Sequence, residues 1–473
     1  MLIERPRTSP GRTGQPDPAP GTEPHPAPDS DPDPVAALPE PPRSTLPSPV
    51  ATLAFGKYRY RLLPRLQRKY GPVFELRIAP HRRRIVLVAD PDDIRTVFTG
   101  PSTVFHAGDG NAILGPIMGQ HSVLLLDEAD HLRVRQLLMP AFHGAALRGY
   151  RELIERITRA ELDRWPVDQP VEVHRRMQNL TLEVILRVVF GVVDEQRLAR
   201  LRPVVDRVLN LSPVLMLGWF YPRLRTIPPW RGFAAIQRTL DELLYAEIAD
   251  RRRQPDLADR SDVLSRLLRI SSDAPKPVTP LSDAELRDNL VTLLLAGHET
   301  TATSLAWAFY EFSRRPDELA RAQQAADTAD ESYLQAVFKE SLRLHPIIYE
   351  VARFTTADVE LGGYRIRRGA TVMPAIGLVQ ADGAHYPDPE RFDPSRFLAA
   401  TPAQNTWIPF GGGVRRCLGA GFAQLEADVV LAEVLRRFDL EPGRRRPEHP
   451  MARNITLAPS GGARVILRRR QPG

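Results

Sequence analysis

The chain of 473 residues contains a single cysteine, Cys417, and this restricts how it can be held together. A lone thiol cannot form an internal disulfide, so the fold must rest on a hydrophobic core. It also cannot supply the several ligands of a structural zinc site or an iron–sulfur cluster. It can still serve as the one protein ligand to a metal that a macrocycle already holds.

The neighbours of Cys417 suit that last role. Residues 410–419 read FGGGVRRCLG. We expect Gly413 and Gly419 to let the backbone turn tightly and to bring its amide groups close to a sulfur anion. Arg415 places a fixed positive charge where a carboxylate-bearing cofactor would lie. A buried structural cysteine is the ordinary alternative for a lone thiol, and this combination of residue types argues against it.

The chain is not uniform in composition. Residues 1–50 hold 15 of the 46 prolines and few large apolar residues. Such a segment cannot bury enough surface to offset the entropy lost on ordering, so residues 1–45 are predicted to be a disordered Pro-rich tail. The tail has no apolar run long enough for a signal peptide or a membrane anchor. Residues 46–473 are predicted to form one large domain of a monomeric, cytoplasmic protein.

The charge balance is basic. The formal net charge is +7, and the tail contributes four Lys/Arg and seven Asp/Glu, so the remainder carries +10. Such a balance raises the question of nucleic-acid binding, but the arginine triplets are scattered along the chain without aromatic stacking residues. We therefore expect no nucleic-acid partner, and at most a basic patch that attracts an acidic protein.

A long helix is predicted near the middle of the chain. Ser282 and Glu285 have the spacing of a capping box, and the apolar pattern continues to about Ser313, just before Pro316. Residues 296–301, AGHETT, lie in its middle. A glycine inside a helix costs about 1 kcal/mol relative to alanine, and hydroxyl side chains can disturb the backbone ladder. A kink without chemistry is one reading of this segment; a functional site is the other.

Taken together, these segments resemble the cytochrome P450 family. Residues 410–419 match its haem-ligand loop, Phe-x-x-Gly-x-Arg-x-Cys-x-Gly, at every defined position. Residues 296–301 match the Ala-Gly-x-Asp/Glu-Thr-Thr of its central helix, and Glu340 with Arg343 matches its Glu-x-x-Arg element. The resemblance covers about residue 45 to the C-terminus, with the elements in family order.

The resemblance implies a haem site. Cys417 would be the axial thiolate of haem b iron, and a thiolate ligand favours cleavage of the O–O bond. Phe410 would pack over the sulfur. Other residues would contact the cofactor through charge or close approach. They are His131, Arg135, Ala296, Gly297, Arg353, Arg415 and Gly419.

The resemblance also implies catalytic and structural roles. Glu299 and Thr300 would be the catalytic acid–alcohol pair that relays protons to dioxygen, for which Gly297 leaves room. Each charged residue taken separately has a surface salt bridge as its alternative. A structural triad would support the haem-side core. It consists of Glu340, Arg343 and Arg396.

The implied fold is mainly α with small β-sheets, the triangular prism of the family. Helical patterns dominate residues 130–350, and short strand signals lie near residues 73–78, 85–88, 370–373 and 463–467. One segment departs from the family pattern. Residues 380–383 are QADG, where relatives often carry His-Arg-Asp-Pro, which puts one local structural contact in doubt.

The implied function is that of a haem-thiolate monooxygenase. It would insert one oxygen atom from O2 into a hydrophobic small molecule, with electrons from a separate ferredoxin or flavodoxin and its reductase. The expected pocket walls are apolar: residues 107–122, 208–220, 293–301 and 347–351. Two alternatives remain: a peroxide-dependent peroxygenase, a group that lacks the acid–alcohol pair, and a non-enzymatic haem-binding adaptor that acts through its Pro-rich tail.

Overall fold

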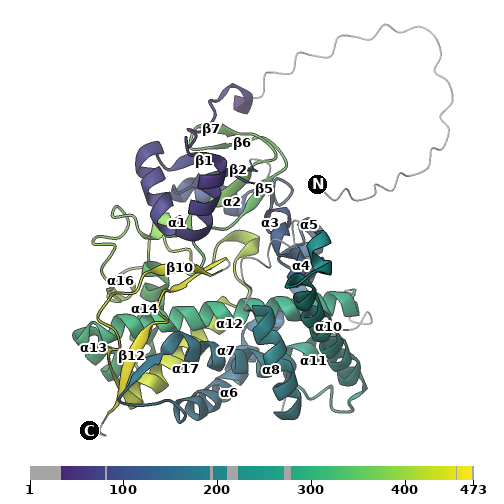
Figure 1. Ribbon diagram of the computed structural model, residues 1–473, viewed down its shortest axis with the longest axis vertical. Coiled ribbons are helices and arrows are strands. Elements are labelled where there is room, and N and C mark those ends of the chain that lie inside the picture. Colours follow the sequence, from purple (N-terminus) through teal and green to yellow (C-terminus); the bar gives the residue numbers. More distant parts are fainter. Residues whose placement is uncertain are drawn as a thin grey trace, which may run out of the picture.

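The computed structural model describes residues 34–79, 83–191, 195–209, 222–270, 279–453 and 455–470. Most of the predicted tail, residues 1–33, lies outside the described residues. So do residues 210–221, which hold most of one predicted pocket wall. Helices dominate the described chain and four small sheets accompany them (Figure 1). The predicted fold class, mainly α with small sheets, is confirmed.

The largest sheet has five strands in the order β1–β2–β8–β5–β3. They are β1 (Val73–Ile78), β2 (Arg83–Val88), β8 (Thr371–Pro374), β5 (Arg353–Thr355) and β3 (Phe105–His106). Neighbours are antiparallel except β2 and β8. In this sheet His106 pairs with Phe354, so the chain near residue 106 lies beside Arg353 at the edge that faces the site.

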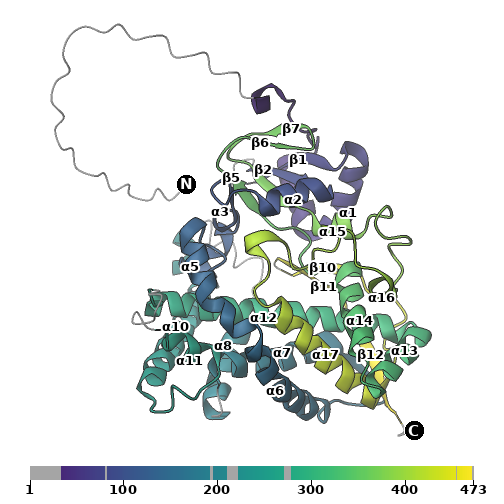
Figure 2. The same cartoon turned by 180° about the vertical axis from the view of Figure 1, so that it is seen from behind.

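The central helix is α12 (Asp283–Ser313), and its predicted capping box is present. The Ser282 hydroxyl accepts a hydrogen bond from the Glu285 amide (3.3 Å), and the Glu285 carboxylate accepts one from the Ser282 amide (2.8 Å). Figures 1 and 2 show α12 crossing the molecule with α7 (Val173–Phe190) along the side away from the five-stranded sheet. α17 (Ala420–Arg437) follows Cys417 and packs on α12 and α6 (Ala145–Leu162).

The other helices surround this centre. They are α1 (Ser48–Tyr70), α2 (Pro91–Thr99), α3 (Ala107–Gly110), α4 (Gly115–Met118), α5 (Glu128–Leu138), α8 (Glu195–Leu209), α10 (Trp230–Arg253), α11 (Val263–Leu268), α13 (Pro316–Asp327), α14 (Glu331–Leu344), α15 (Ile376–Gln380) and α16 (Arg396–Ala399). Short 3-10 turns are η1 (Pro34–Ala37), η2 (Ala112–Leu114), η3 (Met139–Phe142), η4 (Pro222–Thr226) and η5 (Gly413–Arg415).

Three smaller sheets complete the fold. Their strands are β4 (Pro170–Glu172), β12 (Arg464–Arg469) and β9 (Phe438–Pro442); β10 (Pro450–Arg453) and β11 (Thr456–Pro459); and β6 (Val359–Leu361) and β7 (Tyr364–Ile366). The core forms two clusters, a large one centred on α7, α12 and α17, and a smaller one under the five-stranded sheet. Among the described residues, no helix is both long and apolar enough to span a bilayer.

The N-terminal boundary lies earlier than the sequence predicted. The sequence predicts a tail through residue 45, yet residues 42–44 pair with β1 of the main sheet and Pro39 accepts a hydrogen bond from the Arg365 amide of β7 (2.8 Å). The Ser44 amide donates to the Glu75 carbonyl of β1 (2.8 Å), and the Glu75 amide donates to the Pro42 carbonyl (2.8 Å). Arg43 also pairs with the buried Glu75 carboxylate at 3.2 Å. Proline lacks an amide donor but keeps its carbonyl, so a Pro-rich strip can still pair along a strand edge.

Candidate active site

The loop that carries Cys417 is held by backbone contacts. The Cys417 amide donates a hydrogen bond to the Phe410 carbonyl (2.8 Å), which closes the loop on itself. Gly413 has φ +61°, and a Cβ there would lie 1.8 Å from the Phe98 carbonyl oxygen of α2. Only glycine can therefore occupy position 413 without moving the loop away from α2. The tight turn predicted at Gly413 is present.

The chain turns at residues 418–419, but this turn does not require glycine. The φ of Gly419, −90°, is ordinary for any residue, and a Cβ there would meet nothing within 4 Å. The Gly419 amide instead donates a hydrogen bond to the Cys417 sulfur, which favours the thiolate. This is the amide-to-sulfur contact that the sequence suggested, made without an unusual backbone angle.

The Cys417 thiol lies in a concave part of the surface. It is exposed to solvent, yet protein atoms surround it closely enough for burial to raise its pKa, against the lowering effects of the Gly419 amide and of the charges on Arg416 and Arg135. Exposure and dense surroundings occur together when a side chain faces a hollow lined by protein. Phe410 packs against the helical core, edge-to-face with Trp407 at 5.9 Å between ring centroids, and so anchors the start of the loop.

Cationic side chains gather beside this thiol. Arg415 donates to the Leu126 carbonyl and to the Asp127 carboxylate, both at 2.5 Å. Arg353, on β5, is buried and donates to the Ala352 carbonyl (2.8 Å). Burial and the charge of Arg415 lower the pKa of Arg353 to about 10. Burial also lowers the pKa of Arg415 to about 10, although Asp127 opposes the shift.

Two further side chains come from α5, one neutral and one cationic, from residues four apart on one helix face. His131 is buried, and burial together with the charges of Arg415 and Arg135 lowers its pKa to about 3. The imidazole is therefore neutral and able to donate one hydrogen bond. Burial also lowers the pKa of Arg135, against the favourable charge of Cys417.

These residues fit haem. Positive charge is in excess around Arg353, Arg415 and His131. Among the described residues, Asp127 is the one carboxylate that acts on these three groups. Uncompensated buried cations are costly unless an anion pairs with them. A cofactor with two carboxylates and a metal open to a thiolate satisfies both the cations and Cys417.

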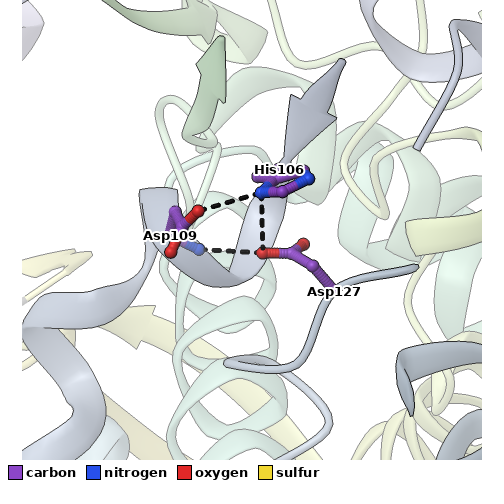
Figure 3. Close-up of side chains that lie close together, drawn as sticks. All are labelled: His106, Asp109 and Asp127. Carbon is purple, nitrogen blue, oxygen red and sulfur yellow. Dashed lines mark hydrogen bonds and ion pairs between the residues drawn. The ribbon is translucent and has the colours of Figure 1, made fainter. Parts of the chain in front are cut away.

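Asp127 also connects this cluster to the sheet (Figure 3). Its carboxylate accepts hydrogen bonds from the Gly108 and Asp109 amides at 2.9 and 3.1 Å. The His106 ring contacts the Asp109 carboxylate (2.9 Å) and, through its other nitrogen, the Glu128 carboxylate (2.9 Å). The ligand atoms of His106, Asp109 and Asp127 lie within 4.8 Å of one another. Their charges are already balanced by Arg415 and by a protonated imidazole.

The middle of α12 presents one open face. Ala296 is exposed although most of the helix is buried, and Thr300, one turn later, is half-buried. The Thr300 hydroxyl donates a hydrogen bond to the Ala296 carbonyl (2.7 Å), as threonines in helices commonly do. The hydroxyl oxygen can still accept a hydrogen bond from another group. This face offers one hydroxyl group in otherwise small, apolar surroundings.

Gly297 has a packing reason that the sequence did not reveal. A Cβ at this position would lie 2.9 Å from the Ile185 Cδ1 of α7. The glycine therefore allows α7 to approach α12 closely. The sequence showed only that a glycine lies inside a predicted helix. It could not show the contact with Ile185, which lies far from Gly297 in the chain. The predicted role of Gly297 beside dioxygen stays a prediction.

Glu299 points toward α7 rather than along the Thr300 face. Its carboxylate accepts a hydrogen bond from Gln178 (2.5 Å), and His174 Nε2 lies 3.6 Å from its other oxygen. Burial alone would raise the pKa of Glu299, but His174, Arg453 and Gln178 together hold it below the usual value. Sequence reasoning missed His174 and Gln178. They lie four apart on α7, and nothing in their spacing points to α12.

The predicted structural triad is assembled away from the thiol. Arg343 binds the Glu340 carboxylate through two nitrogens at 2.7 and 2.8 Å, with both side chains fully buried, and Arg396 approaches Glu340 at 3.6 Å.

The structure also explains Gln380, the first residue of the segment that departs from the family pattern. Its side-chain amide donates to the Leu342 carbonyl (2.9 Å) and accepts from the Ile408 amide (3.2 Å), so it joins the end of α14 to the segment before the Cys417 loop.

Comparisons with known proteins agree with this geometry. The family model described as Cytochrome P450 matches residues 39–466. A putative cytochrome P450 135A1 of Mycobacterium tuberculosis is 46% identical over 420 residues, which cover 88% of this chain and 93% of the relative. A putative cytochrome P450 135B1 of Mycobacterium bovis is 45% identical over 418 residues, covering 87% of this chain and 88% of the relative.

A solved structure extends the agreement to three dimensions. The structure titled retinoic acid bound cyanobacterial CYP120A1 is similar with a TM-score of 0.77 and 25% identity, covering 92% of this chain and all of that one, 100%. The fold, the thiolate loop and the cationic cluster thus point the same way as the sequence relatives. This chain belongs to the cytochrome P450 family and is a haem-thiolate monooxygenase.

Proposed function

We propose that this monooxygenase inserts one oxygen atom from O2 into a hydrophobic small molecule, with haem b as its cofactor and a separate ferredoxin or flavodoxin as its electron donor. The observation that carries the proposal is the Cys417 thiol in a protein-lined hollow beside an excess of buried cations. The bound haem supplies the redox-active iron at which dioxygen is reduced.

The chain's own residues bind and orient this group. Cys417 would hold the iron as a thiolate, stabilised by the Gly419 amide. Arg353 and Arg415 would bind the carboxylates through charge-assisted hydrogen bonds, with His131 as a neutral donor beside them. Asp127 orients Arg415 for this contact. These residues together would hold the cofactor and balance the charge of its carboxylates.

The proton-handling residues would lie on α12. Thr300 offers a hydroxyl whose proton goes to the Ala296 carbonyl, which leaves its oxygen able to accept from water. Glu299, one residue before it, is an anion held below its usual pKa and can take up and release protons. We propose that the pair delivers protons for reduction of dioxygen. The peroxygenase alternative lacks this pair.

Several observations support a hydrophobic substrate. Of the predicted walls, Ile117, Met118 and Ile347 are buried or nearly so, and Ile113 is exposed. The similar solved structure is titled as binding retinoic acid, a hydrophobic molecule. We infer an apolar substrate, because these segments also carry large apolar side chains.

The electron donor is proposed to be acidic. Arg416 is exposed beside Cys417 and supports a basic docking face. Arg133, on α5, is occupied instead: it pairs with Glu285 and donates to the Thr279 carbonyl (3.4 Å). The docking contribution of α5 would then come from other side chains, and complementary charge would raise the rate of encounter.

The test measures the origin of the inserted oxygen. Hydrophobic compounds that shift the haem absorption on binding would be incubated with a ferredoxin, its reductase, NADPH and ¹⁸O2. We expect product that carries one ¹⁸O atom from the gas and none from water. Product formed with hydrogen peroxide, but not with reductant and O2, would contradict the proposal and support a peroxygenase.

A further inference from the structure

A polar cleft on the far side of Glu299 reaches the residues that hold its carboxylate. The cleft has a volume of about 1370 Å³ and lies among α6, α7, α8 and strands β10 to β12. Its lining includes His174, Gln178 and Arg453, the three residues that surround the Glu299 carboxylate, together with His298 and Asp206. Water in the cleft therefore has access to the partners of Glu299 from a side other than the Thr300 face.

The hydrogen bonds fix the proton on the His174 ring. The Thr303 hydroxyl donates to the Glu299 backbone carbonyl (2.8 Å), so its oxygen can only accept from a further partner. His174 Nε2 lies 3.0 Å from that oxygen and must be the donor. The Nε2–H group thus lies between Thr303 and the Glu299 carboxylate oxygen at 3.6 Å, an oxygen with no hydrogen bond among the described residues.

The electrostatic setting makes Glu299 an acceptor. Burial opposes the charge, yet His174, Arg453 and Gln178 keep the pKa of Glu299 lowered, so the carboxylate is ionised near neutral pH. The charged or titratable groups that act on it come from two elements besides its own: His174 from α7 and Arg453 from β10. Its helix neighbour His298 cannot compete as a proton donor, because burial lowers its pKa to about 4.

We propose that His174 is a positioning residue that passes protons from water in this cleft to Glu299. In each transfer, a hydronium ion in the cleft gives a proton to His174 Nδ1 and is left as water, the Nε2–H bond breaks, and that proton bonds to the Glu299 carboxylate. The ring is left neutral with its proton on Nδ1, and exchange with cleft water restores the Nε2–H form. The inference rests on the proposed proton role of Glu299 and adds the entry route.

The test uses two matched histidine variants of the holoenzyme. His174→Gln keeps a side-chain N–H donor toward Thr303 and Glu299 but cannot relay a proton. His298→Gln changes the other histidine of the cleft, which makes no hydrogen bond to the Glu299 carboxylate. The ferrous–CO spectrum of both variants should match the unmodified protein, which shows that haem ligation and folding are retained.

The first readout needs no turnover. Histidine-selective ¹⁵N NMR of the diamagnetic ferrous–CO form, assigned by the signal lost in His174→Gln, should show the Nε2–H tautomer at neutral pH. Glu299→Gln should move the His174 ¹⁵N signals, because the anion near Nε2 is removed. An Nδ1–H tautomer, or His174 signals that Glu299→Gln leaves unmoved, would overturn the inference.

The second readout follows proton supply during turnover. In His174→Gln we expect the solvent deuterium isotope effect to increase at least ~2-fold and more of the consumed O2 to appear as peroxide, as slow protonation predicts. His298→Gln should leave both unchanged. A His174→Gln enzyme with unaltered isotope effect and peroxide yield would overturn the route. Because the NMR readout is independent of substrate oxidation, failure of the proposed monooxygenation is distinguishable from failure of this contact.

Discussion

At the level of single residues, the site is defined by polar groups that lack sufficient counter-charge within the protein. Burial and mutual repulsion lower the pKa values of Arg353 and Arg415 to about 10 and that of His131 to about 3. Such lowered values identify Arg353 and Arg415 as cations without enough counter-charge and His131 as a neutral donor beside them, and perturbed pKa values of this kind cluster at functional sites. The sequence predicted all three residues through the family resemblance, but their shared lack of counter-charge became visible only in space.

Two of the glycines in the Cys417 loop allow a matched test of backbone requirements. Gly411 and Gly413 both have positive φ, +65° and +61°, but only at Gly413 would a Cβ collide with the Phe98 carbonyl. We expect Gly411→Ala to cost about 1 kcal/mol of stability from backbone strain. Gly413→Ala should cost about 3 kcal/mol more, because the loop must move. Thermal unfolding and haem content of the two variants would check this; equal losses would contradict it.

His106 predicts a pH-dependent contribution to stability. Burial alone would lower its pKa, but Asp109, Glu128 and Asp127 raise it above the ordinary value. Its ion pairs therefore stabilise the fold fully below the unfolded-state pKa of about 6.5, and this stabilisation is lost as pH rises through the higher folded-state pKa.

The measurement compares unfolding of the unmodified protein and His106→Gln across pH. We expect the variant to be less stable by about 1 kcal/mol near pH 5.5 and by much less near pH 9, since the Glu128 partner is half exposed. The exposed His143 provides the control, His143→Gln. A stability difference for His106→Gln that grows with rising pH would contradict the assignment.

At the level of elements, the pairing of α7 with α12 determines the chemistry of the central helix. The capping box and the extent of α12 were predictable because both depend on local spacing. The partners of Glu299 and the reason for Gly297 were not, because they come from α7 and depend on how two helices cross. Periodicity predicts that α7 has a buried face, but it does not indicate which residue meets which across the contact.

Gly297 and Ile185 can be tested as a pair. Gly297→Ala should destabilise the protein by about 2 kcal/mol through overpacking against Ile185 Cδ1, 2.9 Å from the added atom. Ile185→Val removes that atom and should cost about 1 kcal/mol alone. The double variant should be about as stable as Ile185→Val, a coupling that a double-mutant cycle measures. Strictly additive losses would show that the two positions do not share this contact.

At the level of the whole molecule, composition predicted less order near the N-terminus than the structure has. The mainly α class and the small sheets were predictable from the family resemblance and the periodicity. The N-terminal boundary was not, because proline content suggested a tail through residue 45. Residues 42–44 nevertheless pair with β1, and Glu40 contacts Arg367 at 2.5 Å. Composition measures average hydrophobicity and does not detect hydrogen bonds to the unpaired edge of a strand.

Two truncations test this boundary. Removing residues 1–33 should leave unfolding and substrate binding unchanged, as expected for a Pro-rich extension. Removing residues 1–45 should lower the unfolding temperature by several degrees, about the effect of 1–2 kcal/mol, because the buried Glu75 loses Arg43 and β1 loses its backbone partners. Identical unfolding temperatures for the two truncations would contradict the boundary.

The central claim is that Cys417 supplies a thiolate to haem iron, and one spectrum tests it most directly. The dithionite-reduced, carbon-monoxide-bound protein should show a strongly red-shifted Soret band, and Cys417→Ser should lose that band while remaining folded. The cationic cluster and the Gly419 amide would then have the roles assigned to them. A band at the position typical of histidine ligation, or a folded protein that binds no haem, would contradict the account.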